Sequence, residues 1–208
     1  GYGYFPPMQV IIQYYALMQG LQAEYLPDTV QSIAYHDGQR FLPTSAALQA
    51  NAHLRGRVRV QYRGGLTMTV NLNPTENWTV EQAGQSYELP PYGWVATKPG
   101  SILAYSALVQ GKRLDYVDCP AYTYLNTGGE LRRVGALEVQ GAAWLKKNPD
   151  GWTVIPCGKL GYWTADKSLT PAPADRGCPT LIVEAKGWRQ VTARNDQDRE
   201  TVVTAEKL

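Results

Sequence analysis

Carboxylates are the residues whose chemistry could be catalytic, and one pair of them, Asp115 and Asp118, is close in the chain. Hydrolysis of a glycosidic bond needs two carboxylates that face each other across the sugar, about 5 to 9.5 Å apart. The flanking residues predict a strand, and an offset of three along a strand places two side chains on opposite faces. We therefore interpret Asp115 and Asp118 as turn or edge residues and not as a catalytic pair.

The other combinations of reactive residues also favour structural interpretations. His36 and Asp37 are adjacent at a predicted turn, where we expect the Asp37 carboxylate to cap the turn rather than to orient a catalytic base. The acidic tail at 196–200 lacks the central glycine and the spaced bidentate glutamate of a calcium loop. Neither a Gly-x-Ser-x-Gly elbow nor a dinucleotide-type glycine loop is present. We therefore expect no catalytic residue, no metal, no cofactor and no enzyme activity in this chain.

Aromatic side chains offer a different chemistry, the binding of sugars. The chain has 14 Tyr and 6 Trp but only 2 Phe. Aromatic faces stack on the C–H faces of pyranose rings, while nearby amides and carboxylates bind the hydroxyls. The candidates in or beside predicted turns are Tyr92, Trp94, Trp152, Tyr162 and Trp163. Trp94 also fits a core position at the start of a strand, and we expect Trp78 and Trp144 to lie in the core.

A hairpin is the clearest local element. Val58, Val60 and Tyr62 alternate with arginines and a glutamine, and the same alternation resumes over 66–72 after Gly64-Gly65. Period two on both sides of a Gly-Gly turn predicts two antiparallel strands with one apolar face. The polar face carries Arg57, Arg59 and Arg63, which we interpret as a solvated row. The alternative for this row is contact with an acidic surface of a partner domain.

The remaining elements predict a mainly β protein. Apolar residues at helical spacing over 8–26, stopped by Pro27, predict one N-terminal α-helix. Short strands then follow at the spacing of an antiparallel β-sandwich, around 29–35, 78–81, 86–89, 93–97, 102–109, 112–118 and 121–125. Asn126-Thr-Gly-Gly predicts a linker to further strands at 134–140 and 142–146. We expect a helix over 1–27, a β-sandwich domain over 28–127, and a second, smaller β-unit or extension over 128–208.

The composition of the chain limits the classes of partner that we expect. The formal net charge of +2 gives no electrostatic reason to expect nucleic acid or an acidic membrane surface. No apolar run reaches the roughly 18 residues of a membrane-spanning helix. The chain begins Gly1-Tyr-Gly-Tyr without an initiator methionine, from which we expect a piece of a longer protein.

Several short motifs between residues 14 and 125 resemble the C-terminal β-domain that follows the TIM barrel in amylase-like and related glycosidases. They are Tyr14-Tyr15-x-Leu-Met at the helix end, Tyr35-His36-Asp37-Gly38, Thr44-Ser45-x-Ala-Leu, Gly65-Leu66-x-Met-x-Val-Asn71, Trp78-Thr-Val, Tyr87-x-Leu-Pro-Pro-x-Gly-Trp-Val and Ala104-Tyr-Ser-Ala. The resemblance implies that a catalytic barrel lies upstream and that 8–26 is its final helix. It also implies an extracellular or periplasmic location. Residues 128–208 are not covered by it.

Two hypotheses of different classes follow. The first is a non-catalytic accessory region of a larger carbohydrate-active protein, which braces the catalytic barrel of the parent chain and contacts polysaccharide. The alternative is an adhesion or protein–protein interaction module with no glycan role. An exposed, coplanar pair of aromatic side chains would favour glycan binding, because a sugar platform must be accessible to solvent.

Overall fold

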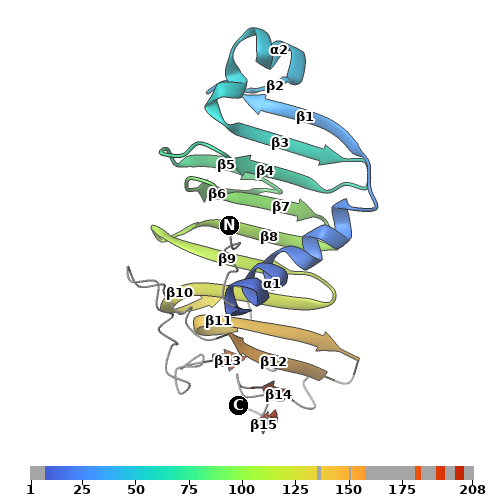
Figure 1. Ribbon diagram of the computed structural model, residues 1–208, viewed down its shortest axis with the longest axis vertical. Coiled ribbons are helices and arrows are strands. Elements are labelled where there is room, and N and C mark those ends of the chain that lie inside the picture. The colour runs from blue at the N-terminus through green and yellow to red at the C-terminus, as the bar shows by residue number, and fades with distance from the viewer. Residues whose placement is uncertain are drawn as a thin grey trace, which may run out of the picture. The chain divides into compact units, whose positions relative to one another are not determined.

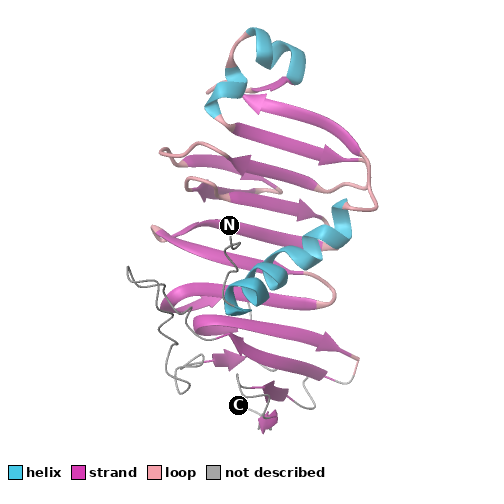
Figure 2. Ribbon diagram, viewed as in Figure 1, coloured by secondary structure: helices cyan, strands magenta, loops and turns pink. Residues whose placement is uncertain are grey.

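A computed structural model describes residues 8–134, 137–149, 151–157, 181–183, 191–194 and 200–203. The chain divides into two compact units, which we call the central unit (19–119) and the terminal unit (1–18 with 120–208). Strands dominate both units (Figure 2), so the predicted mainly β, antiparallel fold with one N-terminal helix is confirmed. The predicted domain boundaries at 27/28 and 127/128 stay predictions.

Helix α1 spans Met8–Tyr25, as its apolar spacing predicts, and ends just before Pro27. Its buried residues are Gln13, Ala16, Leu17 and Leu21. Its exposed apolar residues are Ile11, Tyr14 and Tyr15. Where the burial of α1 is described, small Ala16 is therefore buried, and Tyr14 and Tyr15 lie outside the buried stripe.

The sheet of the central unit has the strand order β2-β1-β3-β4-β7-β8-β9, and every neighbouring pair is antiparallel (Figure 1). The strands are β1 (Val30–His36), β2 (Phe41–Pro43), β3 (Arg57–Tyr62), β4 (Thr67–Asn71), β7 (Trp94–Lys98), β8 (Ile102–Val109) and β9 (Lys112–Asp118). Between β2 and β3 the chain forms α2 (Thr44–Gln49) and the 3-10 helix η1 (Ala52–Arg55).

The predicted hairpin is confirmed as β3 and β4. Val58 is opposite Val70 and Val60 is opposite Met68, so these residues share one face of the sheet. Arg57 is opposite Asn71 and Arg59 is opposite Thr69 on the other face, which we call the polar face. The Gly64-Gly65 turn joins the two strands, and Gly65 has a φ of 92°, a conformation that suits glycine.

A second hairpin, β5 (Trp78–Gln82) and β6 (Gln85–Leu89), adds a layer over the polar face. The side chain of Gln82 bonds this hairpin to the sheet. The Gln82 amide donates to Thr97 Oγ1 at 2.9 Å and to the Thr67 carbonyl at 3.0 Å, and its oxygen accepts from the Thr69 hydroxyl at 2.7 Å. Because Thr67, Thr69 and Thr97 belong to β4 and β7, these bonds join the two layers in a local sandwich.

Three tyrosines pack in a row between the same hairpin and the sheet. The Tyr87 and Tyr105 ring centroids are 5.6 Å apart, and those of Tyr105 and Tyr116 are 5.3 Å apart. All three residues are buried, and burial raises the pKa of Tyr105 to about 12. The row connects β6 to β8 and β9 through side chains. The hairpin is therefore held on the sheet both by the Gln82 hydrogen bonds and by the packed tyrosines.

The terminal unit contains β10 (Tyr122–Val134), β11 (Leu137–Asn148), β12 (Gly151–Cys157), β13 (Leu181–Val183), β14 (Val191–Arg194) and β15 (Glu200–Val203). β10, β11 and β12 pair antiparallel in sequence order, and β14 runs parallel to β12. The segment predicted as a linker, 126–129, belongs to β10, where the register with β11 shifts between Asn126 and Leu131. The Thr127 hydroxyl accepts the Gly141 N–H at 2.9 Å, so this bulge keeps a bond to β11 and the strand continues.

The aromatic core of the terminal unit holds the first part of α1. The buried Tyr122 hydroxyl donates to the Ala16 carbonyl at 2.6 Å. Trp144 contacts the Tyr122 ring edge-on at 5.7 Å and the Tyr15 ring at 6.0 Å. Trp144 is buried, which confirms its predicted core position.

We predict that Gln82→Met lowers the free energy of unfolding by about 2 kcal/mol, because the Thr69 and Thr97 hydroxyls lose a partner that methionine cannot replace. Urea denaturation followed by circular dichroism measures the change. Thr79→Val, on the exposed side of β5, is the control and should leave stability nearly unchanged. Equal stability of Gln82→Met and the unmodified chain would contradict this account of the hairpin.

Candidate functional site

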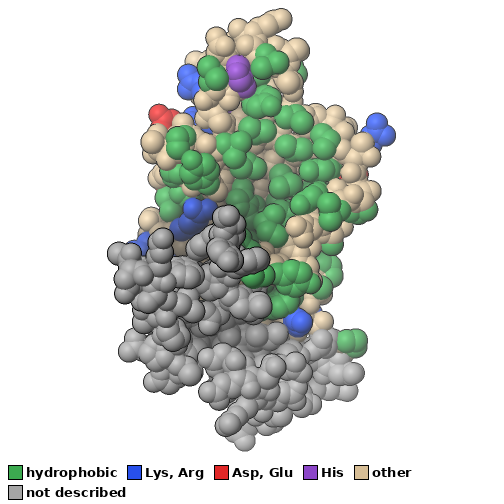
Figure 3. Space-filling model, viewed as in Figure 1, with side chains coloured by type: hydrophobic (Ala, Val, Ile, Leu, Met, Phe, Trp, Pro, Cys, Tyr) green, Lys and Arg blue, Asp and Glu red, His purple; other side chains and the backbone are tan. Residues whose placement is uncertain are grey.

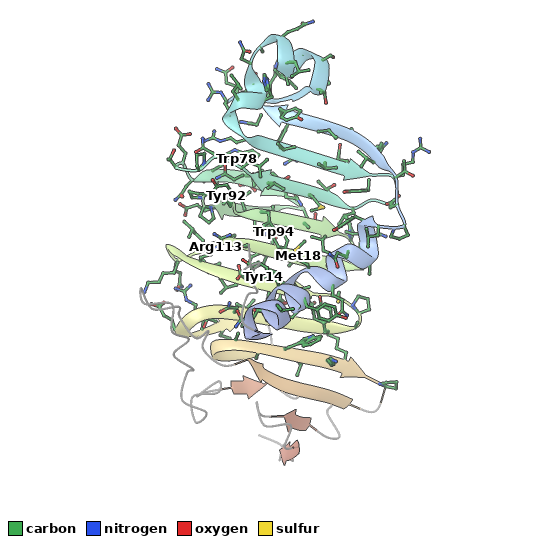
Figure 4. The ribbon with its side chains drawn as sticks, in the orientation of Figure 1. Tyr14, Met18, Trp78, Tyr92, Trp94 and Arg113 are labelled. Carbon is green, nitrogen blue, oxygen red and sulfur yellow. The ribbon has the colours of Figure 1, made fainter. Side chains whose placement is uncertain are left out.

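Several strand ends of the central sheet carry aromatic or basic residues at the same end. Arg57 of β3 is opposite Asn71 of β4, and Trp94 of β7 is opposite Val70, so these positions align across the sheet. Trp78, Tyr92, Trp94 and Arg113 are labelled on this side of the unit in Figure 4. We call this region the loop end of the central sheet, defined by His36, Phe41, Arg57, Trp78, Tyr92, Trp94 and Arg113.

Tyr92 occupies an unusual position at the loop end. The Gly93 N–H donates to the Pro90 carbonyl at 2.7 Å and closes a tight turn around Tyr92. Tyr92 has a φ of 59°, in the left-handed region where a bulky side chain is strained, and it is 59% exposed. Among the described residues with positive φ other than glycine, Tyr92 is the only aromatic one. The turn therefore presents a phenol ring to solvent at some conformational cost.

Asn71 holds this turn from below. Its side chain is fully buried, and its amide nitrogen donates to the Glu76 carbonyl at 2.8 Å and to the Leu89 and Pro90 carbonyls at 3.0 Å. Its backbone N–H donates to the Gly93 carbonyl at 2.8 Å. One residue thus fixes two of the connections at this end of the sheet, 72–77 and 90–93.

Arg113 supports the turn from the side of β9. Its guanidinium donates to the Tyr92 carbonyl at 3.2 Å and to the Ser106 hydroxyl at 2.8 Å, and the Ser106 hydroxyl donates to Asp115. Burial raises the pKa of Asp115, opposed by the Ser106 hydrogen bond and the Arg113 charge. The polar chain from Asp115 through Ser106 to Arg113 therefore positions the Tyr92 turn.

Both carboxylates belong to β9, Asp118 at its end and Asp115 within it, so the interpretation of Asp115 as a turn residue is wrong. Asp115 is opposite Ser106 in the β8–β9 register, and Asp118 is opposite Leu103. Their offset of three places the two side chains on opposite faces of the sheet, so the prediction that they do not face each other is confirmed.

We predict that Asn71→Asp lowers the free energy of unfolding by about 3 kcal/mol or more, because a carboxylate would face three carbonyl oxygens that now receive an amide. Asn73→Asp is a matched control, because the Asn73 side-chain oxygen only accepts, from the Thr75 and Glu76 N–H groups. Denaturation curves of the two variants should differ strongly. Similar curves would show that Asn71 does not act as a donor here.

A second group of side chains lies on the polar face beside the turn, and we call it the arginine–aromatic cluster (His36, Phe41, Arg57, Arg59 and Trp78). The His36 ring centroid is 5.0 Å from that of Phe41 and 5.3 Å from that of Trp78. The Arg59 guanidinium stacks on Phe41 at 3.9 Å, and that of Arg57 lies 5.7 Å from the Trp78 centroid. Trp78 is buried, as predicted for a core residue.

The prediction of a solvated arginine row is therefore wrong for two of its members. Arg59 is partly buried against Phe41 and donates to Thr69 Oγ1 at 3.0 Å, and the Arg57 side chain is only 14% exposed. The reason is tertiary, because the β5–β6 hairpin covers the face that the hairpin pattern alone leaves open. Arg63 follows the end of β3 and is exposed.

The turn after β1 has the predicted cap. The Asp37 carboxylate accepts the Arg40 N–H at 2.8 Å and the Gln39 N–H at 2.7 Å, and these bonds lower the pKa of Asp37. His36 Nδ1 accepts the Gly38 N–H at 3.2 Å. Burial lowers the pKa of His36 below its usual 6.5, and the nearby arginines lower it further against the charge of Asp37. His36 is therefore a neutral ring within the cluster at pH 7.

We predict that the free energy of unfolding falls as the pH falls through 6.5 towards the lower pKa of folded His36. In this window the unfolded chain binds the proton that the folded cluster disfavours, so protonation favours unfolding. His36→Asn, which keeps an acceptor near the Gly38 N–H, should reduce the slope of stability against pH between 7 and 5. Parallel pH profiles of the two proteins would contradict the assignment.

The other predicted sugar-binding residues are placed as follows. Tyr92 and Trp94 both lie at the loop end, Tyr92 exposed and Trp94 half-buried as the first residue of β7. Trp152 lies in β12 opposite Lys147, and its side chain is outside the described part of the structure. Tyr162 and Trp163 lie outside the described residues. Sequence reasoning gave no role to Arg113 or to Asn71, although Asn71 ends one of the quoted motifs, because both act through contacts between distant segments.

Comparisons with protein-family models, curated proteins and solved structures found no match for this chain. No three histidine, cysteine or acidic side chains among the described residues are grouped so as to hold a metal ion. None of the helices that the structure describes has the length and apolar composition needed to cross a membrane. The loop end is therefore the region of the described structure from which a function can be inferred.

Proposed function

We propose that this chain is a non-catalytic accessory region of a larger carbohydrate-active protein and that its loop end contacts polysaccharide. The observation that carries the proposal is the exposed ring of Tyr92, held at a positive φ on a turn braced by Asn71 and Arg113. Strained backbone that persists in a well-braced turn is a reason to look for a function at that residue.

A braced aromatic ring suits a sugar ligand for two physical reasons. Its open face can cover the apolar side of a pyranose ring, and its hydroxyl can bond a sugar hydroxyl. Because the backbone around Tyr92 is held by the Pro90–Gly93 bond and by Arg113, little backbone freedom is left to lose on binding. Weak ligands such as single polysaccharide chains gain most from such preorganisation.

The non-catalytic part of the proposal follows from the carboxylates. Asp115 is bonded to Ser106 below the turn, and Asp118 projects from the other face of β9. A glycosidase needs two carboxylates on the two sides of one sugar. We therefore assign catalysis to another part of the protein, in line with the resemblance to the β-domain of amylase-like glycosidases.

The alternative function, a protein–protein module, has an observation in its favour. The face of the sheet opposite the polar face carries apolar side chains, and Figure 3 shows them gathered over β1, β3 and β4. Val30 and Ile33 are exposed, and Val58, Val60 and Val70 are half-buried. Contiguous apolar surface of this kind marks interaction sites, and it also suits a region that braces a larger body.

We predict that the chain binds at least one polysaccharide of a broad panel and that Tyr92→Gly weakens binding at least tenfold. Glycine tolerates the positive φ, so the same change should keep the free energy of unfolding or raise it by up to about 1 kcal/mol. Affinity electrophoresis and pull-down on insoluble glycans measure binding, and urea denaturation measures stability. Loss of binding without loss of stability would separate a ligand contact from a structural role.

Three further variants complete the experiment. Tyr14→Ala removes another exposed tyrosine, on α1, and should bind like the unmodified chain. Trp152→Ala and Trp163→Ala test the two other predicted platforms in the same assays. No binding to any glycan, at protein concentrations that detect millimolar affinity, would overturn the proposal and leave the interaction module as the better function.

A further inference from the structure

The arginine–aromatic cluster carries more positive charge than the carboxylates beside it balance. Arg59 donates to the Thr69 hydroxyl and the Glu81 carbonyl, and no carboxylate among the described residues lies within ion-pair distance of it. Burial lowers the pKa of Arg59, which reflects the cost of keeping this charge away from water. A negative group brought to this place would offset that cost.

Arg57 shows an unused donor at the same place. Its Nη2 pairs with Glu76 at 3.0 Å, but Glu76 itself is 64% exposed. Its Nε is buried and has no acceptor among the described residues. Buried N–H groups are almost always bonded, so this donor points to a partner that the chain does not supply.

A third guanidinium lies at the rim of the cluster. If Gly38 carried a Cβ atom, that atom would lie 3.3 Å from Arg55 Nη1. The Arg55 guanidinium therefore lies against the turn after His36. The charges of Arg55, Arg57 and Arg59 all act on His36. Two carboxylates beside the cluster are already engaged, Asp37 with backbone N–H groups and Glu76 with Arg57. The local charge is therefore positive although the whole chain carries only +2.

The cluster is connected to the Tyr92 turn through one residue. Arg57 is the register partner of Asn71, and the Asn71 amide donates to the Pro90 carbonyl at the start of that turn. A saccharide that stacks on Tyr92 and continues along the loop end would therefore meet the arginines.

We propose that the arginine–aromatic cluster binds the anionic group of an acidic saccharide, a carboxylate or a sulfate ester. This inference rests on the proposed function and adds the ligand class. Guanidinium groups pair with such oxyanions through two parallel N–H bonds. A guanidinium that stacks on an aromatic ring is held in a fixed plane, which favours this pairing. A nucleic acid would need an extended basic surface, which the near-neutral chain does not offer.

Titration calorimetry on the full chain tests the inference with three oligosaccharides of equal length, an oligogalacturonate, a sulfated dextran oligomer and a neutral malto-oligosaccharide. The expected result at 50 mM NaCl is at least tenfold tighter binding of one anionic oligosaccharide than of the neutral one. The preference should shrink at 300 mM NaCl, because salt screens the arginine charges. Which anionic probe binds identifies carboxylate or sulfate as the preferred group.

Arg59→Met keeps an apolar chain over Phe41 and removes the charge, and Arg55→Gln changes an exposed residue that the fold does not need. Both variants should lose most of the preference for the anionic oligosaccharide and keep neutral binding. Arg63→Met is the matched control, an exposed arginine beyond the far end of β3, and should keep the preference.

The outcomes separate this inference from the proposed function. Equal affinity of the unmodified chain for neutral and anionic oligosaccharides would overturn the anionic site and leave glycan binding at Tyr92 intact. A loss of preference in Arg63→Met as large as in Arg59→Met would also overturn it, because general charge would then explain the binding. Absence of binding to all three probes and to the polysaccharide panel would overturn both proposals.

Discussion

The amide of Asn71 is the interaction on which the loop end depends. Its buried side chain donates to three carbonyls, one in 72–77 and two at 89–90, and its backbone N–H donates to a fourth carbonyl, that of Gly93. The position of Tyr92 follows from the turn that this amide holds, and the position of Trp78 follows from the connection that leads into β5. Arg57, opposite Asn71, is brought to the same place by the register of β3 and β4. The proposed sugar contact and the proposed anionic site therefore share one support.

Local pattern was sufficient to predict elements whose residues contact near neighbours in the chain. The alternation around Gly64-Gly65 predicted β3, β4 and their apolar face, because period two assigns each side chain to a face. The offset of three between Asp115 and Asp118 predicted opposite faces for the same reason. The cap by Asp37 was predictable because its bonds reach only two and three residues along the chain.

Contacts between distant segments account for what local pattern missed. The arginine row is covered because the hairpin at 78–89 packs over the polar face, where Gln82 bonds to β4 and β7. No rule on residue spacing predicts that contact. The predicted linker at 126–129 is a bulge within β10, since Thr127 supplies bonds that a Gly-Gly pair alone does not suggest. The positive φ of Tyr92 was hidden as well, because turn rules favour glycine or asparagine there.

The row of Tyr87, Tyr105 and Tyr116 gives the central unit an intrinsic optical probe. Neighbouring phenol rings at 5.3 and 5.6 Å in a fixed packing contribute to the near-ultraviolet circular dichroism of the protein, and this contribution disappears when side-chain packing loosens. The row joins β6 to β8 and β9, so its share of the signal depends on whether the hairpin is packed on the sheet. Detachment of the hairpin can thus be observed without a label and apart from the backbone spectrum of the strands.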